Sequence, residues 1–83
     1  MKLWIGNISP DVSDAELTEF VCKYGSPSPS HIQRVPGDGS RPAAILSFDG
    51  YVDDKLVATQ TRLNGMYWKG RELAAQTLVH FSG

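Results

Sequence analysis

The side chains in this sequence that could do chemistry are suited to binding rather than to catalysis. There is no nucleophile with an adjacent base and no pair of carboxylates placed for a cleft. Cys22 is the single cysteine and is accompanied only by His31 and His80, which leaves no ligand set for a structural zinc site and no internal disulfide. We therefore expect no enzyme activity, no bound metal and no cofactor.

Two candidate binding residues lie near the start of the chain. Trp4 stands between Leu3 and Ile5, and the alternation of a strand places it on the face opposite to theirs. An exposed ring among apolar neighbours usually marks a contact surface, although the end of the chain could instead shield it. Asn7 offers a donor and an acceptor, but an Asn at a strand end more often forms a turn.

Other candidates come from later segments. Gln33 and Arg34 lie in an expected strand at residues 31–35, and a bulge in that strand would change the face on which each lies. The sequence leaves open which of them joins Trp4. Arg41 could pair with a phosphate or stack on a base, and it is equally suited to be a solvated loop charge.

Hydrophobic periodicity and turn residues divide the chain into alternating strands and helices. Ser13 and Glu16 form a capping-box pattern that predicts a helix from Ser13 to a stop at Gly25, and a second helix is expected from about Val52 to Leu63. The expected strands are 2–6, 31–35, 43–48, a short 66–68, and 71–75 with an extension through Thr77 to Phe81 left open. The order predicts an α+β, ferredoxin-like βαββαβ sandwich, in which two helices cover one face of a four-stranded antiparallel sheet.

Tyr67 and Trp68 form an aromatic pair after the second helix, beside Lys69 and Arg71. A chain of this size has little core, so we expect the pair to pack against the sheet edge rather than to bind a ligand.

Length and charge limit the partners. Eighty-three residues suit one domain, 1–83, with a core at about 2–76 and an extension or tail at 77–83. Eight Lys and Arg against nine Asp and Glu give a net charge of −1, so any contact with nucleic acid must be local. The first apolar run is too short for a signal peptide or a membrane span, which favours an intracellular protein, cytoplasmic or nuclear, without a membrane partner.

Several motifs in order resemble the RNA-recognition motif family, over nearly the whole chain from Lys2 to about Gln76. The family's six-residue ribonucleoprotein motif reads here as Leu3-Trp4-Ile5-Gly6-Asn7-Ile8, a full match. Further stretches stand where the family has them: Lys23-Tyr24-Gly25, the pair Ile32 and Val35, Leu63-Asn64-Gly65 and Gly70-Arg71-Glu72-Leu73. The resemblance implies RNA binding on the open face of the sheet.

The family's eight-residue motif is where this sequence departs. It aligns to residues 41–48 and keeps the basic Arg41 and the aromatic Phe48. At its third and fifth positions, where the family presents rings to bases, the chain has Ala43 and Ile45. The resemblance thus implies weak binding.

Two functions stay open at this point. The first is a module that contacts short single-stranded RNA through Trp4, Asn7, Arg41, Ala43, Ile45, Gln33 and Arg34. The alternative is a protein-interaction module that uses the same apolar face for a protein partner or for a homodimer. One protein-binding branch of the family has Arg-any-Phe before the last strand, and Arg71-Glu72-Leu73 lacks the Phe.

Overall fold

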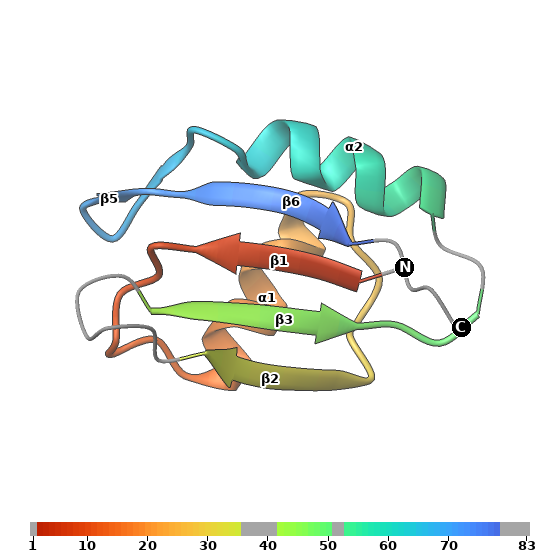
Figure 1. Cartoon of the computed structure of the whole chain (residues 1–83), viewed down its shortest axis with the longest axis horizontal. Helices are drawn as coiled ribbons and strands as arrows, with labels where there is room; N and C mark the ends of the chain where they lie inside the picture. Colours follow the sequence, from red (N-terminus) through yellow and green to blue (C-terminus); the bar gives the residue numbers. More distant parts are fainter. Residues whose placement is uncertain (1, 36–41, 51–52, 79–83) are drawn as a thin grey trace.

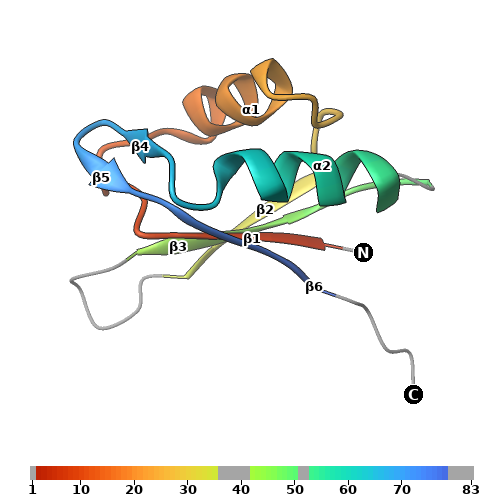
Figure 2. The ribbon, with the colours of Figure 1, turned by 90° about the horizontal axis from the view of Figure 1, so that it is seen from above.

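The chain forms one four-stranded sheet covered by two helices on a single face. The computed structural model describes residues 2–35, 42–50 and 53–78. Its elements are β1 (Lys2–Gly6), α1 (Asp14–Lys23), β2 (His31–Val35), β3 (Ala43–Ser47), α2 (Asp53–Leu63), β4 (Tyr67–Trp68), β5 (Arg71–Glu72) and β6 (Ala74–Leu78). The antiparallel sheet has the order β2-β3-β1-β6, as Figure 1 shows, and β4 and β5 form a small separate hairpin. Both helices lie on the same side of the sheet (Figure 2), which confirms the expected ferredoxin-like α+β fold.

The first helix begins where the capping pattern predicts. Ser13 is the N-cap in an extended conformation, and its hydroxyl accepts a hydrogen bond from the backbone N–H of Glu16 at 3.1 Å. Gly25 follows the helix with a φ of 103°, a left-handed conformation that glycine adopts without strain. The buried stripe of Leu17, Phe20 and Val21 faces the sheet.

The core lies between the helices and one face of the sheet. Leu3 and Ile5 on β1 and Leu46 on β3 are completely buried there, and Phe48 packs against the same cluster. Because successive side chains of a strand point to opposite faces, Trp4 must lie on the uncovered face. We call this uncovered side the open face.

The last expected strand is divided, which corrects the sequence-based boundary of 71–75. Arg71–Glu72 pairs with Tyr67–Trp68, and the chain joins β1 only from Ala74 onward. Leu73, between the two segments, is buried; its backbone N–H donates to the carbonyl of Met66 and its carbonyl accepts from the N–H of Gly65, both at 2.8 Å. The first part of the expected strand, Arg71–Glu72, therefore pairs in the β4–β5 hairpin, and only the part from Ala74 onward pairs in the four-stranded sheet.

Some expectations fall outside the described residues. Arg41, Val52 and the C-terminal extension beyond Leu78 lie there. The expected strands on either side of residues 36–41 pair as the antiparallel neighbours β2 and β3, with Val35 opposite Ala43. Within the described ranges, neither helix has the length and apolar character needed to cross a membrane.

Candidate nucleic-acid interface

The register of the sheet decides which side chains share the open face with Trp4. Trp4 lies opposite Ile45 on β3 and Gln76 on β6, and Ile45 lies opposite Gln33 on β2. Every residue of β2 has a single partner on β3, so the strand contains no bulge. The described strand residues of the open face are His31, Gln33, Val35, Ala43, Ile45, Ser47, Lys2, Trp4, Gly6, Ala74, Gln76 and Leu78.

The indole of Trp4 lies along β1, over the backbone of Gly6. A Cβ atom built on Gly6 would lie 2.6 Å from Cζ2 and 3.0 Å from Cζ3 of the ring, closer than a real contact allows. The six-membered ring therefore fills the space that a side chain at position 6 would need. Gly6 is buried although no helix covers this face, whereas Trp4 is only partly buried.

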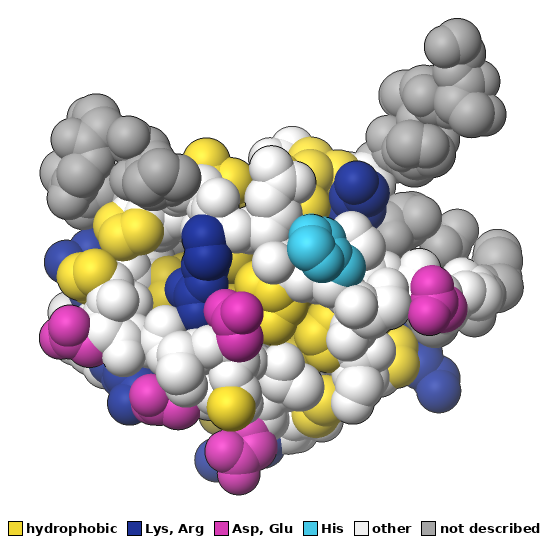
Figure 3. Space-filling view, turned by 90° about the horizontal axis from the view of Figure 1, so that it is seen from below, with side chains coloured by type: hydrophobic (Ala, Val, Ile, Leu, Met, Phe, Trp, Pro, Cys, Tyr) yellow, Lys and Arg dark blue, Asp and Glu magenta, His cyan; other side chains and the backbone are white. Residues whose placement is uncertain are grey.

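The described strand residues of the open face carry little charge, and what they carry is positive. Lys2 is the one Lys or Arg among the strand residues described there, His31 lies in the same row, and none of those residues is acidic. Figure 3, which looks onto the β2 edge, shows basic and acidic side chains scattered over that edge rather than gathered in one patch of a single sign. A polyanion would meet no repulsion from these strand residues.

Arg34 lies on the other face, so the structure does not bring this predicted site residue to Trp4. Its Nε donates to Asp14 Oδ1 at 2.9 Å, and its Nη2 donates to the carbonyl of Val12 at 2.8 Å. The guanidinium therefore ties β2 to the start of α1. The alternation that places Gln33 on the open face necessarily places Arg34 on the helix side.

Asn7 is held within the fold. It has a φ of 63°, in the left-handed region that Asn tolerates better than most residues. Its side-chain amide donates to the carbonyl of Glu72 at 2.9 Å, and its Oδ1 accepts from Arg71 Nη1 at 3.2 Å. The amide thus joins the end of β1 to β5.

The two positions where the family has rings differ in exposure. Ala43 is only 6% exposed and lies beside Gly6, so its methyl group offers little surface. Ile45 is partly exposed beside Trp4. Sequence reasoning missed Gln76, since period-2 alternation through 74–78 identifies its face only once β6 is known to pair with β1.

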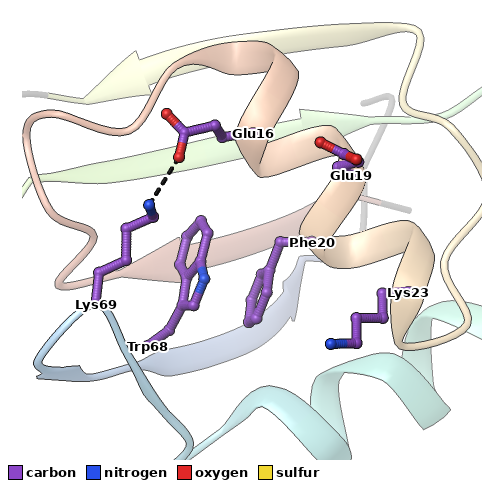
Figure 4. A pocket seen from close by; sticks show the side chains of 6 residues that line it. All are labelled: Glu16, Glu19, Phe20, Lys23, Trp68 and Lys69. Atoms are coloured by element: carbon purple, nitrogen blue, oxygen red, sulfur yellow. Dashed lines mark ion pairs between the residues drawn. The ribbon is translucent and has the colours of Figure 1, made fainter.

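A second aromatic group lies on the helix side, in a groove of about 470 Å³ that we call the Trp68 groove. Figure 4 shows the residues that line it: Glu16, Glu19, Phe20, Lys23, Trp68 and Lys69. Trp68 stacks on Phe20 with ring centroids 3.9 Å apart and an interplanar angle of 10°. Trp68 packs within the chain rather than standing free, as expected, but its partner is Phe20 of α1 and not the sheet edge. The expectation of packing is wrong for Tyr67, which is 73% exposed.

An ion pair spans this groove. Lys69 Nζ lies 2.8 Å from Glu16 Oε2. Hydrogen bonding from Lys69, then from the Ser13 backbone, and the positive charge of Lys69 hold the pKa of Glu16 below its ordinary value of 4.5. The acidic start of α1 is therefore partly neutralised by the β4–β5 hairpin.

Comparisons with known proteins agree with this architecture. No family model matches the chain. It is 34% identical over 77 residues to a Synechocystis sp. protein named "Putative RNA-binding protein RbpA", an alignment that covers 88% of this chain and 71% of that protein. The chain belongs to the RNA-recognition motif family.

Solved structures share the fold at low sequence identity. The RRM3 domain of Pes4 superposes with a TM-score of 0.77 at 13% identity, covering 99% of this chain and 95% of that one. The RRM of Rna15, solved with a bound GU RNA, gives a TM-score of 0.71 at 15% identity and covers 95% and 83%. At such identities these likenesses establish the fold alone.

Proposed function

We propose that this chain binds single-stranded RNA on its open face, with Trp4 as the ring on which one base stacks. The observation that carries the proposal is the position of the indole, on a central strand and on the face that no helix covers. Two comparisons support it: the curated relative is named for RNA binding, and the RRM of Rna15 was solved with RNA.

The neighbours of Trp4 suit a base better than they suit a phosphate chain. Stacking of a base on an aromatic ring contributes about 1–3 kcal/mol. Gln76 and Gln33 bring exposed amides that can donate to and accept from base edges, and Ile45 adds an apolar contact. Because the family's other two rings are replaced by Ala43 and Ile45, we expect weak binding of a short segment.

Fluorescence tests the proposal directly because the chain has only two tryptophans. In a Trp68→Phe variant, Trp4 is the sole indole, and titration with a short mixed-sequence RNA should quench its emission as a base stacks on it. In the matched Trp4→Phe variant, Trp68 is the sole indole and should respond little. NMR spectra that show no shift at Trp4, Ala43 or Ile45 with millimolar RNA would refute the proposal.

A second candidate function is a protein-interaction surface on the same face, for a partner or for a second copy of the chain. The sparse charge favours it, since Lys2 is the only Lys or Arg among the described strand residues there, whereas Ile45 and Val35 are apolar. RNA binding should weaken as salt rises, and apolar association should not. Size-exclusion chromatography at low and high salt, with and without RNA, separates the two.

A further inference from the structure

We propose that Gly6 is a positioning residue for Trp4: the absent side chain leaves the space in which the indole lies along β1. The ring then rests on the sheet in one pose instead of extending into solvent. The consequence for RNA affinity rests on the proposed function, whereas the consequence for the ring itself does not.

The backbone gives no other reason for glycine at this position. Gly6 is the last residue of β1, paired in register with Ala43 and Ala74, and it is absent from the residues with positive φ, which include Gly25 and Gly65. Glycine in a paired strand residue loses more conformational freedom on folding than other residues and has no side chain to pack. A residue type that is unfavourable for the local secondary structure is expected mainly at functional sites.

The neighbours of Gly6 are also small. Its partners across the sheet are Ala43 on β3 and Ala74 on β6, so no side chain in this row of the open face is larger than a methyl group. The indole of Trp4 lies over Gly6, which explains why Gly6 is buried on an uncovered face. A methyl group on Gly6 would contact Cη2 and its two neighbours in the ring, so the ring must move.

Gly6→Ala should therefore change the pose of the ring without harming the fold. The atoms that would clash are at the far end of a side chain, which can rotate away, and the strand gains a residue with a better propensity. In the Trp68→Phe background, we expect an unchanged or higher melting temperature. We also expect a red-shifted Trp4 emission and stronger quenching by acrylamide.

The effect on RNA affinity should depend on the size of the ring at position 4. We expect Gly6→Ala to weaken binding by about tenfold with Trp4 present, and by less than about threefold in a Trp4→Phe background, because phenyl does not reach the outer edge of the indole. Such coupling is the signature of a steric contact between the two side chains. Equal losses in both backgrounds would overturn the inference.

The fluorescence measurements need no RNA, so the two proposals can fail separately. If emission and acrylamide quenching are the same in Gly6→Ala as in its parent, Gly6 does not position the ring. If they shift as expected while the parent protein binds no RNA, the positioning role stands and the proposed function falls. If Gly6→Ala unfolds the protein, the Trp4→Phe background decides: restored folding supports the contact, and continued unfolding contradicts it.

Discussion

The two tryptophans of this chain lie on opposite sides of one sheet in different surroundings. Trp68 stacks on Phe20, and Lys69 Nζ lies 5.8 Å from the centroid of its ring. Trp4 makes no comparable ring or cation contact with any described residue and lies over the backbone of Gly6. Among the described residues, Trp68 is held by contacts within the chain, whereas Trp4 has no such ring or cation partner, and this difference is what the proposed function rests on.

Charge follows the same division. The Trp68 groove holds Glu16 and Glu19 together with Lys69, so its charges can neutralise one another locally. The described strand residues of the open face carry Lys2 and no carboxylate. The chain is slightly acidic as a whole, so net charge conceals a face that an anion can approach.

Trp68→Ala should cause the largest stability loss and Trp4→Ala little. Truncation of Trp68 removes the stack on Phe20 and leaves a cavity beside the core, at a cost of about 3 kcal/mol in the free energy of unfolding. Trp4→Ala should cost less than about 1 kcal/mol, because the ring packs on one face only. Urea denaturation of both variants measures the difference. Equal losses would mean that Trp4 is a structural residue.

Trp4→Ala should instead reduce RNA binding. Loss of the stacking ring is expected to raise the Kd by roughly 10- to 100-fold, which corresponds to about 1–3 kcal/mol. Tyr67→Ala is the matched control, since it removes an exposed ring from β4, which is not part of the four-stranded sheet. Fluorescence anisotropy with a labelled RNA compares them. A similar loss in both variants would place the RNA elsewhere.

Local sequence patterns predicted the elements of this fold because their causes are local. Ser13 and Glu16 form a helix cap between residues three apart, and Leu3 and Ile5 identify the buried face of β1 by alternation. These signals need no knowledge of distant partners. They were sufficient to place Trp4 on the open face.

Which candidate residues lie together on the open face depends on contacts between residues that are distant in the sequence. The face of Arg34 depends on the register of β2 against β3 and on the acceptors at Val12 and Asp14, which lie about 20 residues away. The family motif accepts any residue at the position of Gly6, so the reason for a glycine there becomes visible only with the ring of Trp4 in place. Tertiary placement, rather than residue type, separates the residues proposed to bind from the structural ones here.

Arg34→Ala should lower stability by a smaller amount and leave RNA binding unchanged, which distinguishes the helix side of β2 from the open face. It removes two hydrogen bonds and an ion pair of 2.8 Å whose side chains are 37% and 63% exposed, so solvent screens part of the interaction. We expect a loss of about 1 kcal/mol in unfolding free energy and no change in RNA affinity. Gln33→Ala, one residue away on the open face, should weaken RNA binding without loss of stability. Reduced RNA affinity in folded Arg34→Ala would return Arg34 to the site.

The smallest effect concerns the ion pair in the Trp68 groove. The pKa of Glu16 is held below 4.5, first by hydrogen bonding from Lys69, so the folded state favours the carboxylate. This stabilisation is present above the unfolded pKa and is lost as pH falls through the lower, folded value. In an NMR titration, Lys69→Met should raise the pKa of Glu16 toward 4.5, although the Ser13 backbone preserves part of the shift.

Lys23→Met, which removes another cation from the same groove, should leave the Glu16 titration nearly unchanged. Equal changes in the two variants would mean that Glu16 responds to the overall charge of the helix side rather than to the contact with Lys69. The lowered pKa of Glu16 would then not be evidence that the charges of the Trp68 groove neutralise one another through direct contacts.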